Sequence, residues 1–197
     1  MSRVGILGGT FNPIHNGHLI VARHAYSELD LDYVLIIPNH HPQYRSIEDV
    51  EDEDRINMIK LAVEGEDAFV YSDIEMAREG ATYTVDTLRE LKELSPSDSF
   101  YFIMGADSLM YFDKWRQSSD IVKLSHILIA VRGDDDIIRC NEKISELGYT
   151  DRMTMLKSPN TIISSSYIRE YIKAGRDITG LVPDRVRDYI LERGLYI

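Results

Sequence analysis

Residues 1–18, MSRVGILGGTFNPIHNGH, decide the fold of this chain, because they join a strand to a helix through a glycine turn. Residues 3–7 form a short apolar run that predicts a buried strand, and residues 8–13 have the composition of a turn. A helical pattern begins directly after them. Glycine lets the backbone approach an anion closely, and the start of a helix offers phosphate unpaired N–H groups and the positive end of its dipole. The stretch therefore predicts a phosphate site at the end of the first strand.

Two histidines, His15 and His18, stand three residues apart where the helical pattern begins. Side chains with this spacing project from one face of a helix, so both imidazoles are expected to reach the same spot and donate to phosphate. A different hypothesis places zinc between these histidines and His40 and His41. Zinc sites need three or four converging ligands, and no spacing in the sequence secures that geometry. Simple exposure on the helix, or capping of a turn, is a third interpretation.

The composition fits a soluble globular protein and limits what the chain binds. The chain has 197 residues, 44% of them hydrophobic, and a formal charge of −11 from 33 acidic and 22 basic residues. Such a charge argues against broad binding to nucleic acid or to an acidic membrane, so neither is an expected partner. A bound polyphosphate must then be neutralised locally, by clustered arginine and histidine or by a metal ion.

The cysteine content and the hydropathy pattern favour a cytoplasmic location. The single cysteine, Cys140, excludes an intrachain disulfide and fits a reducing cytosol, where we expect it to be inert. No apolar run approaches the length of a membrane span, and the chain enters a strand without a signal-like segment. We therefore expect a cytoplasmic protein.

Short apolar runs alternate with helical patterns along the whole chain. The predicted strands cover residues 3–7, 32–38, 69–71, 99–104, 127–131 and 153–156. The predicted helices cover residues 19–29, 55–63, 85–94 (with Thr84 as N-cap), 136–147, 167–173 and a last helix opened by Pro183. Alternation of this kind predicts parallel strands joined by right-handed crossovers. The expected fold is α/β: a single doubly wound, Rossmann-like domain over residues 1–197, with a parallel sheet and helices on both faces.

The predicted topology brings several loops to one edge of the sheet. In doubly wound folds, ligands bind beyond the carboxyl ends of the strands. Residues 8–18, 39–45 and 105–107, and Arg132, all follow predicted strands. These segments are therefore expected to meet along one rim.

A second helix start suited to phosphate lies near the other end of the chain, in ISSSYIR (163–169). Serine hydroxyls and backbone N–H groups at a helix start bind phosphate, and Arg169, one turn into the helix, adds a charged fork. The serines could equally cap the helix, which is compatible with phosphate binding. The chain contains neither a P-loop sequence nor the G-x-G-x-x-G dinucleotide fingerprint. Two such helix starts in one fold indicate a ligand with a chain of phosphates.

The segments GGTFNPIHNGH (8–18) and ISSSYIR (163–169) resemble the nucleotidyltransferase superfamily, which is marked by a (T/H)-x-G-H signature. Within it, the chain most resembles the bacterial nicotinate-nucleotide adenylyltransferases, and the similarity runs over nearly the whole length. Supporting matches are ATYTVDTL (81–88), Gly-Ala-Asp (105–107) and the downstream Trp115. Singly these matches are weak, but together and in this order they are highly specific.

The resemblance implies an enzyme that converts ATP and nicotinate mononucleotide into deamido-NAD and pyrophosphate, by direct in-line attack on the α-phosphorus without a covalent enzyme intermediate. It assigns catalytic roles to His15, His18 and Arg169. It assigns ATP contacts to Gly8, Gly9, Thr10, Phe11, Gly105, Asp107, Ile163, Ser164 and Ser165. Asp107 is expected at the ribose hydroxyls. Mg²⁺ is the expected cofactor, bound as Mg-ATP, and no residue is named as a metal ligand because such ions keep several waters and few protein ligands.

For the mononucleotide, the resemblance implies Tyr83 and Thr84 near the nicotinate carboxylate, Trp115 stacked on the pyridine ring, and Arg132 at phosphate. Relatives typically carry Pro-Pro-His-Lys where this chain has Pro-Gln-Tyr-Arg (42–45), so Arg45 keeps the cation with a different geometry. The common aspartate of the first motif is Asn12 here, which is expected to preserve the turn.

Other functions and simpler roles remain open on the sequence alone. The acceptor could be nicotinamide mononucleotide or phosphopantetheine, or the chain could be a cytidylyltransferase. It could also bind nucleotides without turnover, or use the histidines in a zinc-dependent hydrolase. Trp115 could be a core aromatic, and Arg132 could form a surface salt bridge. The chain is also a possible homo-oligomer.

Overall fold

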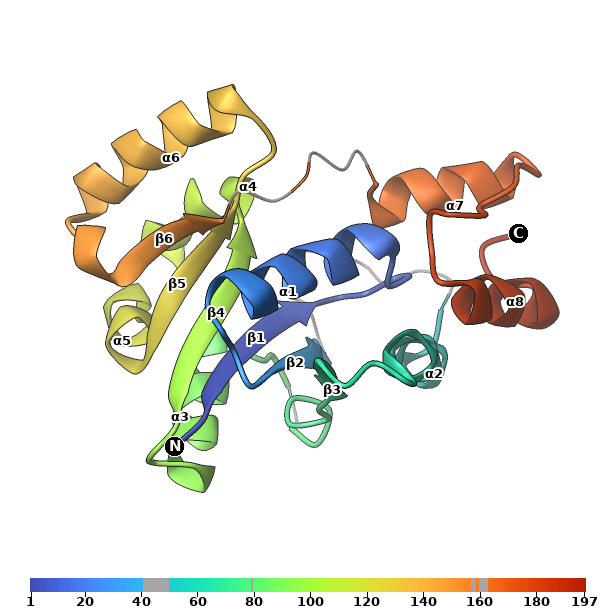
Figure 1. Ribbon diagram of the computed structural model, residues 1–197. Helices are drawn as coiled ribbons and strands as arrows, with labels where there is room; N and C mark the ends of the chain where they lie inside the picture. The colour runs from blue at the N-terminus through green and yellow to red at the C-terminus, as the bar shows by residue number, and fades with distance from the viewer. Residues whose placement is uncertain (41–49, 79, 157–158, 160–162) are drawn as a thin grey trace.

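The computed structural model of the protein describes residues 1–40, 50–78, 80–156, 159 and 163–197 (Figure 1). These residues form one sheet in the order β3-β2-β1-β4-β5-β6, in which every neighbouring pair of strands is parallel. The strands are β1 (Arg3–Gly9), β2 (Tyr33–Pro38), β3 (Phe69–Tyr71), β4 (Ser99–Gly105), β5 (Ser125–Ala130) and β6 (Met153–Leu156). The predicted α/β fold with a parallel sheet is confirmed.

Helices cover both faces of the sheet, and each face has its own hydrophobic core. One core takes side chains from α1 (Asn16–Glu28), α2 (Asp52–Val63), α7 (Ser165–Lys173) and α8 (Asp184–Arg193). The other takes them from α3 (Thr84–Leu94), α4 (Ala106–Leu109), α5 (Ser118–Leu124) and α6 (Asp134–Leu147). The 3-10 turns η1 (Phe112–Lys114) and η2 (Thr150–Arg152) complete the described elements. Among these described helices, none is long and apolar enough to cross a membrane.

The two cores follow from the alternation of side chains along the central strands. In β1, Ile6 enters the core under α3, and its neighbour Leu7 enters the core under α1. Successive side chains of a strand point to opposite faces, so a strand that is covered on both sides reads as a continuous apolar run. Gly5 is required by close packing, because a Cβ built on it would lie 2.9 Å from Cγ2 of Val34 on the next strand.

The structure corrects several predicted boundaries. The first helix begins at Asn16 instead of residue 19, because His15 caps it. Thr84 is the first residue of α3 and not its N-cap; Tyr83 holds the cap position, where no side chain of the described residues caps the helix. The short helices α4 and α5 were not predicted, since four and seven residues are too few for a clear period. The strands at 69–71 and 153–156 match their predicted bounds.

Candidate active site

The carboxyl ends of the central strands meet at one edge of the sheet, as predicted. Gly9 of β1 pairs with Pro38 of β2, and Gly105 of β4 pairs with Ala130 of β5. The backbone N–H of Asn39 donates to the carbonyl of Gly9 at 2.9 Å, which joins the first two loops. The segments that follow β1, β2, β4 and β5 therefore begin along one edge of the sheet.

His15 and His18 cap the start of α1 in a reciprocal arrangement. The backbone N–H of His18 donates to Nδ1 of His15, and the backbone N–H of His15 donates to Nδ1 of His18, both at 3.3 Å. The two rings stack with their centroids 3.6 Å apart and their planes at 20°. Because each Nδ1 accepts a hydrogen bond, each neutral ring carries its proton on Nε2. The cap therefore leaves two Nε2–H groups as donors for a ligand.

The surroundings of the pair keep both rings uncharged. Burial lowers the pKa of His15 to about 4, and the positive charge of Arg132 adds to this effect. Burial also lowers the pKa of His18 well below its usual value, helped by His15 and Arg132. Desolvation disfavours the protonated imidazole, and a nearby guanidinium repels it. At neutral pH the pair therefore consists of two neutral donors.

A pocket of about 240 Å³ opens beside the histidines and is called the histidine pocket here. Seven of the residues predicted for the site line it: His15, His18, Gly105, Arg132, Ile163, Ser164 and Ser165. Arg132 was expected to contact the mononucleotide, but it lies in this pocket together with the residues expected to bind ATP. The residue between the two histidines has no room for a side chain, because a Cβ on Gly17 would lie 3.0 Å from Nδ1 of His15.

The start of α7 holds the glycine turn in place. Ser164 is the N-cap of α7 and accepts from the backbone N–H of Tyr167 at 3.1 Å. The Ser165 hydroxyl donates to the carbonyl of Pro13 at 2.9 Å, and Nη1 of Arg169 donates to the carbonyl of Asn12 at 2.8 Å. Arg169 is not among the described residues that line the histidine pocket. Its observed contact positions the loop that leads to His15.

A second pocket, of about 90 Å³, lies on the α3 side of the sheet and is called the tryptophan pocket here. Its lining residues are Ile6, Gly8, Ile37, Asn39, Glu75, Thr84, Thr87, Leu88, Phe102 and Trp115. Of the residues predicted for the site, it brings together Gly8, Thr84 and Trp115. The Trp115 ring also packs on Phe102 and Phe112, with centroids 6.0 and 5.6 Å away. Trp115 therefore lines the pocket and also packs against the aromatic side chains behind it.

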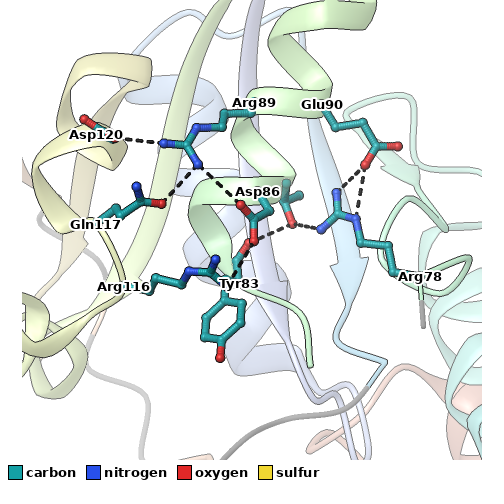
Figure 2. Close-up of polar contacts among 9 residues, drawn as sticks. Arg78, Tyr83, Asp86, Arg89, Glu90, Arg116, Gln117 and Asp120 are labelled. Atoms are coloured by element: carbon teal, nitrogen blue, oxygen red, sulfur yellow. Dashed lines mark hydrogen bonds and ion pairs between the residues drawn. The ribbon is translucent and has the colours of Figure 1, made fainter. Parts of the chain in front are cut away.

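Tyr83 lies beside this pocket but is not among its described lining residues. The guanidinium of Arg116 covers its ring, 4.5 Å from the centroid (Figure 2). Arg116 also pairs with Asp86, which in turn pairs with Arg89, so the start of α3 belongs to a network of charges that reaches α5.

The remaining predicted residues that the structure describes are not among the lining residues of either pocket. The buried Phe11, with φ of 49°, meets the His18 ring edge to face with the centroids 5.0 Å apart, and a Cβ on Gly9 would lie 3.0 Å from the same phenyl ring. Asp107, the second residue of α4, has an exposed carboxylate 3.4 Å from Nη2 of Arg139. Arg45 and His41 lie outside the described residues.

Sequence reasoning missed Arg55, whose buried guanidinium joins the ends of β1 and β2. Its Nη1 donates to the carbonyl of Thr10 at 2.7 Å, its Nη2 donates to the carbonyl of Asn39 at 2.9 Å, and it forms an ion pair with Asp52. Glu75 and Thr87 of the tryptophan pocket were missed as well. For Arg55, the available signal was a charged residue next to an apolar helical pattern. Charged residues occupy many exposed positions of this kind, so the signal did not indicate burial.

The chain is similar to known proteins over nearly its whole length. Residues 6–171 match the model of the family described as cytidylyltransferase-like. The chain is 40% identical over 200 residues to a probable nicotinate-nucleotide adenylyltransferase of Lachnoclostridium phytofermentans, covering 100% of both chains. It is 39% identical to a protein with the same description from Dehalococcoides mccartyi, covering 98% of this chain and 97% of the relative.

A solved structure has the same fold at lower identity. The nicotinic acid mononucleotide adenylyltransferase of Plasmodium falciparum, complexed with NaAD, superposes with a TM-score of 0.80 at 23% identity, covering 100% of this chain and 98% of that one. At this identity, the likeness shows the fold alone. The match of the family model and the identity to full-length relatives show more: the chain belongs to the cytidylyltransferase-like family, and within it to the nicotinate-nucleotide adenylyltransferases.

Proposed function

We propose that this chain transfers the adenylyl group of ATP to nicotinate mononucleotide, giving deamido-NAD and pyrophosphate in NAD biosynthesis. The observation that carries the proposal is the placement of the two pockets. Leu7 lines the histidine pocket and the next residue, Gly8, lines the tryptophan pocket. Successive residues of a strand face opposite sides, so the pockets flank one strand end. Two ligands bound there would bring their phosphates together at the glycine turn.

The histidine pocket suits the triphosphate of ATP. The two Nε2–H groups and the Arg132 guanidinium supply donors and positive charge, and the start of α7 adds backbone N–H groups and serine hydroxyls. We assign His15 and His18 to oxygens of the α- and β-phosphates, and Ser164 and Ser165 to the phosphates that leave. Gly9, Thr10, Phe11, Gly105, Asp107 and Ile163 keep their predicted roles around ATP.

The reaction requires placement of the substrates and stabilisation of charge. A phosphate oxygen of the mononucleotide attacks the α-phosphorus, and the bond from the α-phosphorus to the oxygen bridging to the β-phosphate breaks as pyrophosphate leaves. Such transfer depends on alignment and on donors at the oxygens that gain charge. Neutral imidazoles with fixed Nε2–H groups meet this need without prior loss of a proton. Arg169 acts by holding the loop that carries them.

Mg²⁺ is the proposed metal, and it is expected to arrive with ATP. When bound, it would neutralise phosphate charge and help orient the triphosphate. Across residues 1–40, 50–78, 80–156, 159 and 163–197, no group of three His, Cys, Asp or Glu side chains lies close enough to hold an ion. The chemistry of the donors therefore suits an ion held by phosphate oxygens and water, with the protein supplying cations and N–H groups around it.

The tryptophan pocket suits the ring of the mononucleotide. We propose that the ring stacks on Trp115 and that its carboxylate faces Thr84 at the start of α3, where a helix favours negative charge. Tyr83 and Arg45 keep their predicted roles beside the mononucleotide. Arg132, placed with the histidines, is proposed to contact phosphate where the two substrates meet.

The test is release of pyrophosphate from Mg-ATP with nicotinate mononucleotide, nicotinamide mononucleotide or phosphopantetheine as acceptor. We expect strong preference for the nicotinate form. Turnover with another acceptor alone would overturn the proposed substrate, and binding of ATP with no pyrophosphate release from any acceptor would overturn catalysis. His24→Ala, which changes a histidine of α1 outside the histidine pocket, serves as the control for His18→Ala.

A further inference from the structure

Glu75 is a buried carboxyl in the tryptophan pocket that the proposed chemistry does not use. Its side chain belongs to the segment between β3 and α3, and the residue is only 6% exposed. It lines the pocket together with Thr84 and Trp115, the two residues proposed to contact the ring. A carboxyl buried this deeply needs hydrogen-bond partners, and the identity of those partners indicates its role.

The neighbours of Glu75 lie on both sides of Thr84 in the sequence. The hydroxyl of Thr87 donates to Oε1 of Glu75 at 2.6 Å, and the side chain of Thr82 lies close enough to this carboxyl to lower its pKa. Thr82 precedes Thr84 by two residues, and Thr87 follows it by three. One carboxyl therefore contacts α3 through Thr87 and lies near the residues that lead into this helix.

Two charged residues, Arg78 and Glu90, continue the hydrogen-bond series from Glu75 and Thr87 to the surface. Nη1 of Arg78 donates to the Thr87 hydroxyl at 2.8 Å, and Nε of Arg78 donates to Glu90 at 3.1 Å (Figure 2). The Thr87 hydroxyl has one proton and two acceptors within reach, Glu75 at 2.6 Å and the carbonyl of Tyr83 at 3.4 Å, and the much shorter contact directs the proton to Glu75. The chain runs from Glu90 at the surface through Arg78 and Thr87 to the pocket.

The neighbours of Glu75 reduce the cost of burying its carboxyl without removing it. Burial raises the pKa of Glu75 above its usual value, and the hydroxyl of Thr87, the side chain of Thr82 and the charge of Arg78 oppose that rise only in part. In its ionised form the carboxyl holds the Thr87 hydroxyl strongly, since hydrogen bonds to a charged acceptor are stronger than neutral ones.

We propose that Glu75 is a positioning residue for the mononucleotide, which fixes the Thr82–Thr84 turn at the start of α3 through Thr82 and Thr87. The inference rests on the proposed function, because it takes the tryptophan pocket as the site of the mononucleotide ring. Beyond that function, the Glu75 carboxyl holds Thr84 in place to contact the pyridine ring of the mononucleotide. Loss of that group loosens the mononucleotide site and leaves the histidine pocket intact.

The test uses Trp115 as a probe, because it is the only tryptophan of the chain and it lines the pocket. Quenching of its fluorescence by nicotinate mononucleotide gives a Kd that does not depend on turnover. We expect Glu75→Ala to raise this Kd, and the KM for the mononucleotide, by about tenfold, while the KM for ATP changes by less than about twofold. Glu75→Gln keeps an acceptor for Thr87 and is expected to retain most of the affinity.

Thr87 supplies a matched pair of variants, whose folding is checked by urea unfolding. Thr87→Val keeps the shape and removes the hydroxyl, so it is expected to reproduce the rise in Kd, whereas Thr87→Ser keeps the hydroxyl and restores tight binding. In the double variant of Glu75→Ala and Thr87→Val, the rise in Kd is expected to be smaller than the product of the two single effects, because both changes break the contact between Glu75 and Thr87. Glu192→Gln, which removes an exposed carboxylate on α8 outside the pocket, controls for general loss of charge.

The results separate this inference from the proposed function. Equal affinity of the wild-type protein and of Glu75→Ala for the mononucleotide would refute the inference, as would additive effects of the two substitutions. A parallel rise in the KM for ATP would show that Glu75 supports the whole site and not the mononucleotide turn. Absence of pyrophosphate release by the wild-type protein would instead refute the proposed function, whatever the Trp115 titration gives.

Discussion

The rings of His15 and His18 lie 3.6 Å apart, and each Nδ1 accepts the backbone N–H of the other residue. Histidine here performs the task that serine and glutamate perform in a common capping box. The two hydrogen bonds cap the start of α1 and fix the tautomer of both rings, so that both Nε2–H groups are donors at the pocket. The pair both caps α1 and supplies the proposed donors to phosphate, so it is the first target for substitution.

His18→Ala is expected to lower kcat by about 100-fold or more, because one preorganised donor to a phosphate oxygen is lost. The lost cap is expected to cost about 1 kcal/mol in the free energy of unfolding, so the protein still folds. The measurement is pyrophosphate release together with urea unfolding. His18→Asn keeps an acceptor for the backbone N–H of His15 and separates the two effects. Near-normal turnover of His18→Ala would remove His18 from the mechanism.

The stability of the protein is expected to fall as the pH drops from about 6.5 towards 4. In the unfolded chain, His15 binds a proton near its usual pKa of about 6.5. In the folded protein its pKa is about 4, so between these values the unfolded state binds more protons and acid favours it. The full contribution is present above pH 6.5. At pH 5, His15 alone is expected to cost about 2 kcal/mol.

Urea unfolding at pH 7.5 and at pH 5 measures this loss. His15→Asn supplies the control, since asparagine caps helices well and does not titrate in this range. The variant is expected to show a flatter dependence of the free energy of unfolding on pH. An unchanged slope would mean that carboxyl groups, and not His15, cause the loss.

The sequence predicted the strands, the longer helices and the rim where the candidate site lies, but not the short helices α4 and α5 or how the rim divides into two pockets. The glycine turn, the two histidines and the serine run are local patterns, and the helices that follow them begin two or three residues before their predicted starts. Glu75 meets Thr84, Thr87 and Trp115 only after two crossovers have packed on the sheet. The spacing of these residues in the sequence does not predict that they come into contact, so Glu75 could not be distinguished from an acidic residue on the surface.

Arg132 illustrates the same limit for a residue that was predicted. Its position after β5 places it at the rim, as expected from topology. Which pocket its side chain enters depends on the side of the sheet to which the loop turns, and the sequence pattern carries no such information. The resemblance implied a contact between Arg132 and phosphate, and the structure adds that Arg132 lines the histidine pocket with His15 and His18.

Arg132→Gln is expected to raise the KM for ATP by about tenfold or more, since a charged donor to phosphate is lost. It is also expected to raise the pKa of His15 and His18, because the charge of Arg132 lowers both. Titration of the imidazole signals by NMR measures the second effect without turnover. Arg185→Gln, on the exposed surface of α8, is the control. Unchanged histidine titration would show that Arg132 points elsewhere in solution.

Tyr196 near the end of the chain ties the C-terminal segment to the glycine turn. Its hydroxyl donates to Oδ1 of Asn12 at 2.5 Å, and both residues are buried. Burial raises the pKa of Tyr196, so the hydroxyl stays protonated and remains a donor. Asn12 is thereby held at its side chain by Tyr196 and at its carbonyl by Arg169. The loop that leads to His15 depends on both contacts.

Tyr196→Phe is therefore expected to lower the free energy of unfolding by about 1–3 kcal/mol, because the amide oxygen of Asn12 loses its donor in a buried site. It is also expected to lower kcat, since the loop that carries the histidines gains freedom. Urea unfolding and pyrophosphate release measure the two effects. Ile197→Ala, at an exposed position one residue further on, is expected to change neither. Loss of stability with unchanged kcat would make Tyr196 a packing residue alone and would free the catalytic loop from the C-terminal segment.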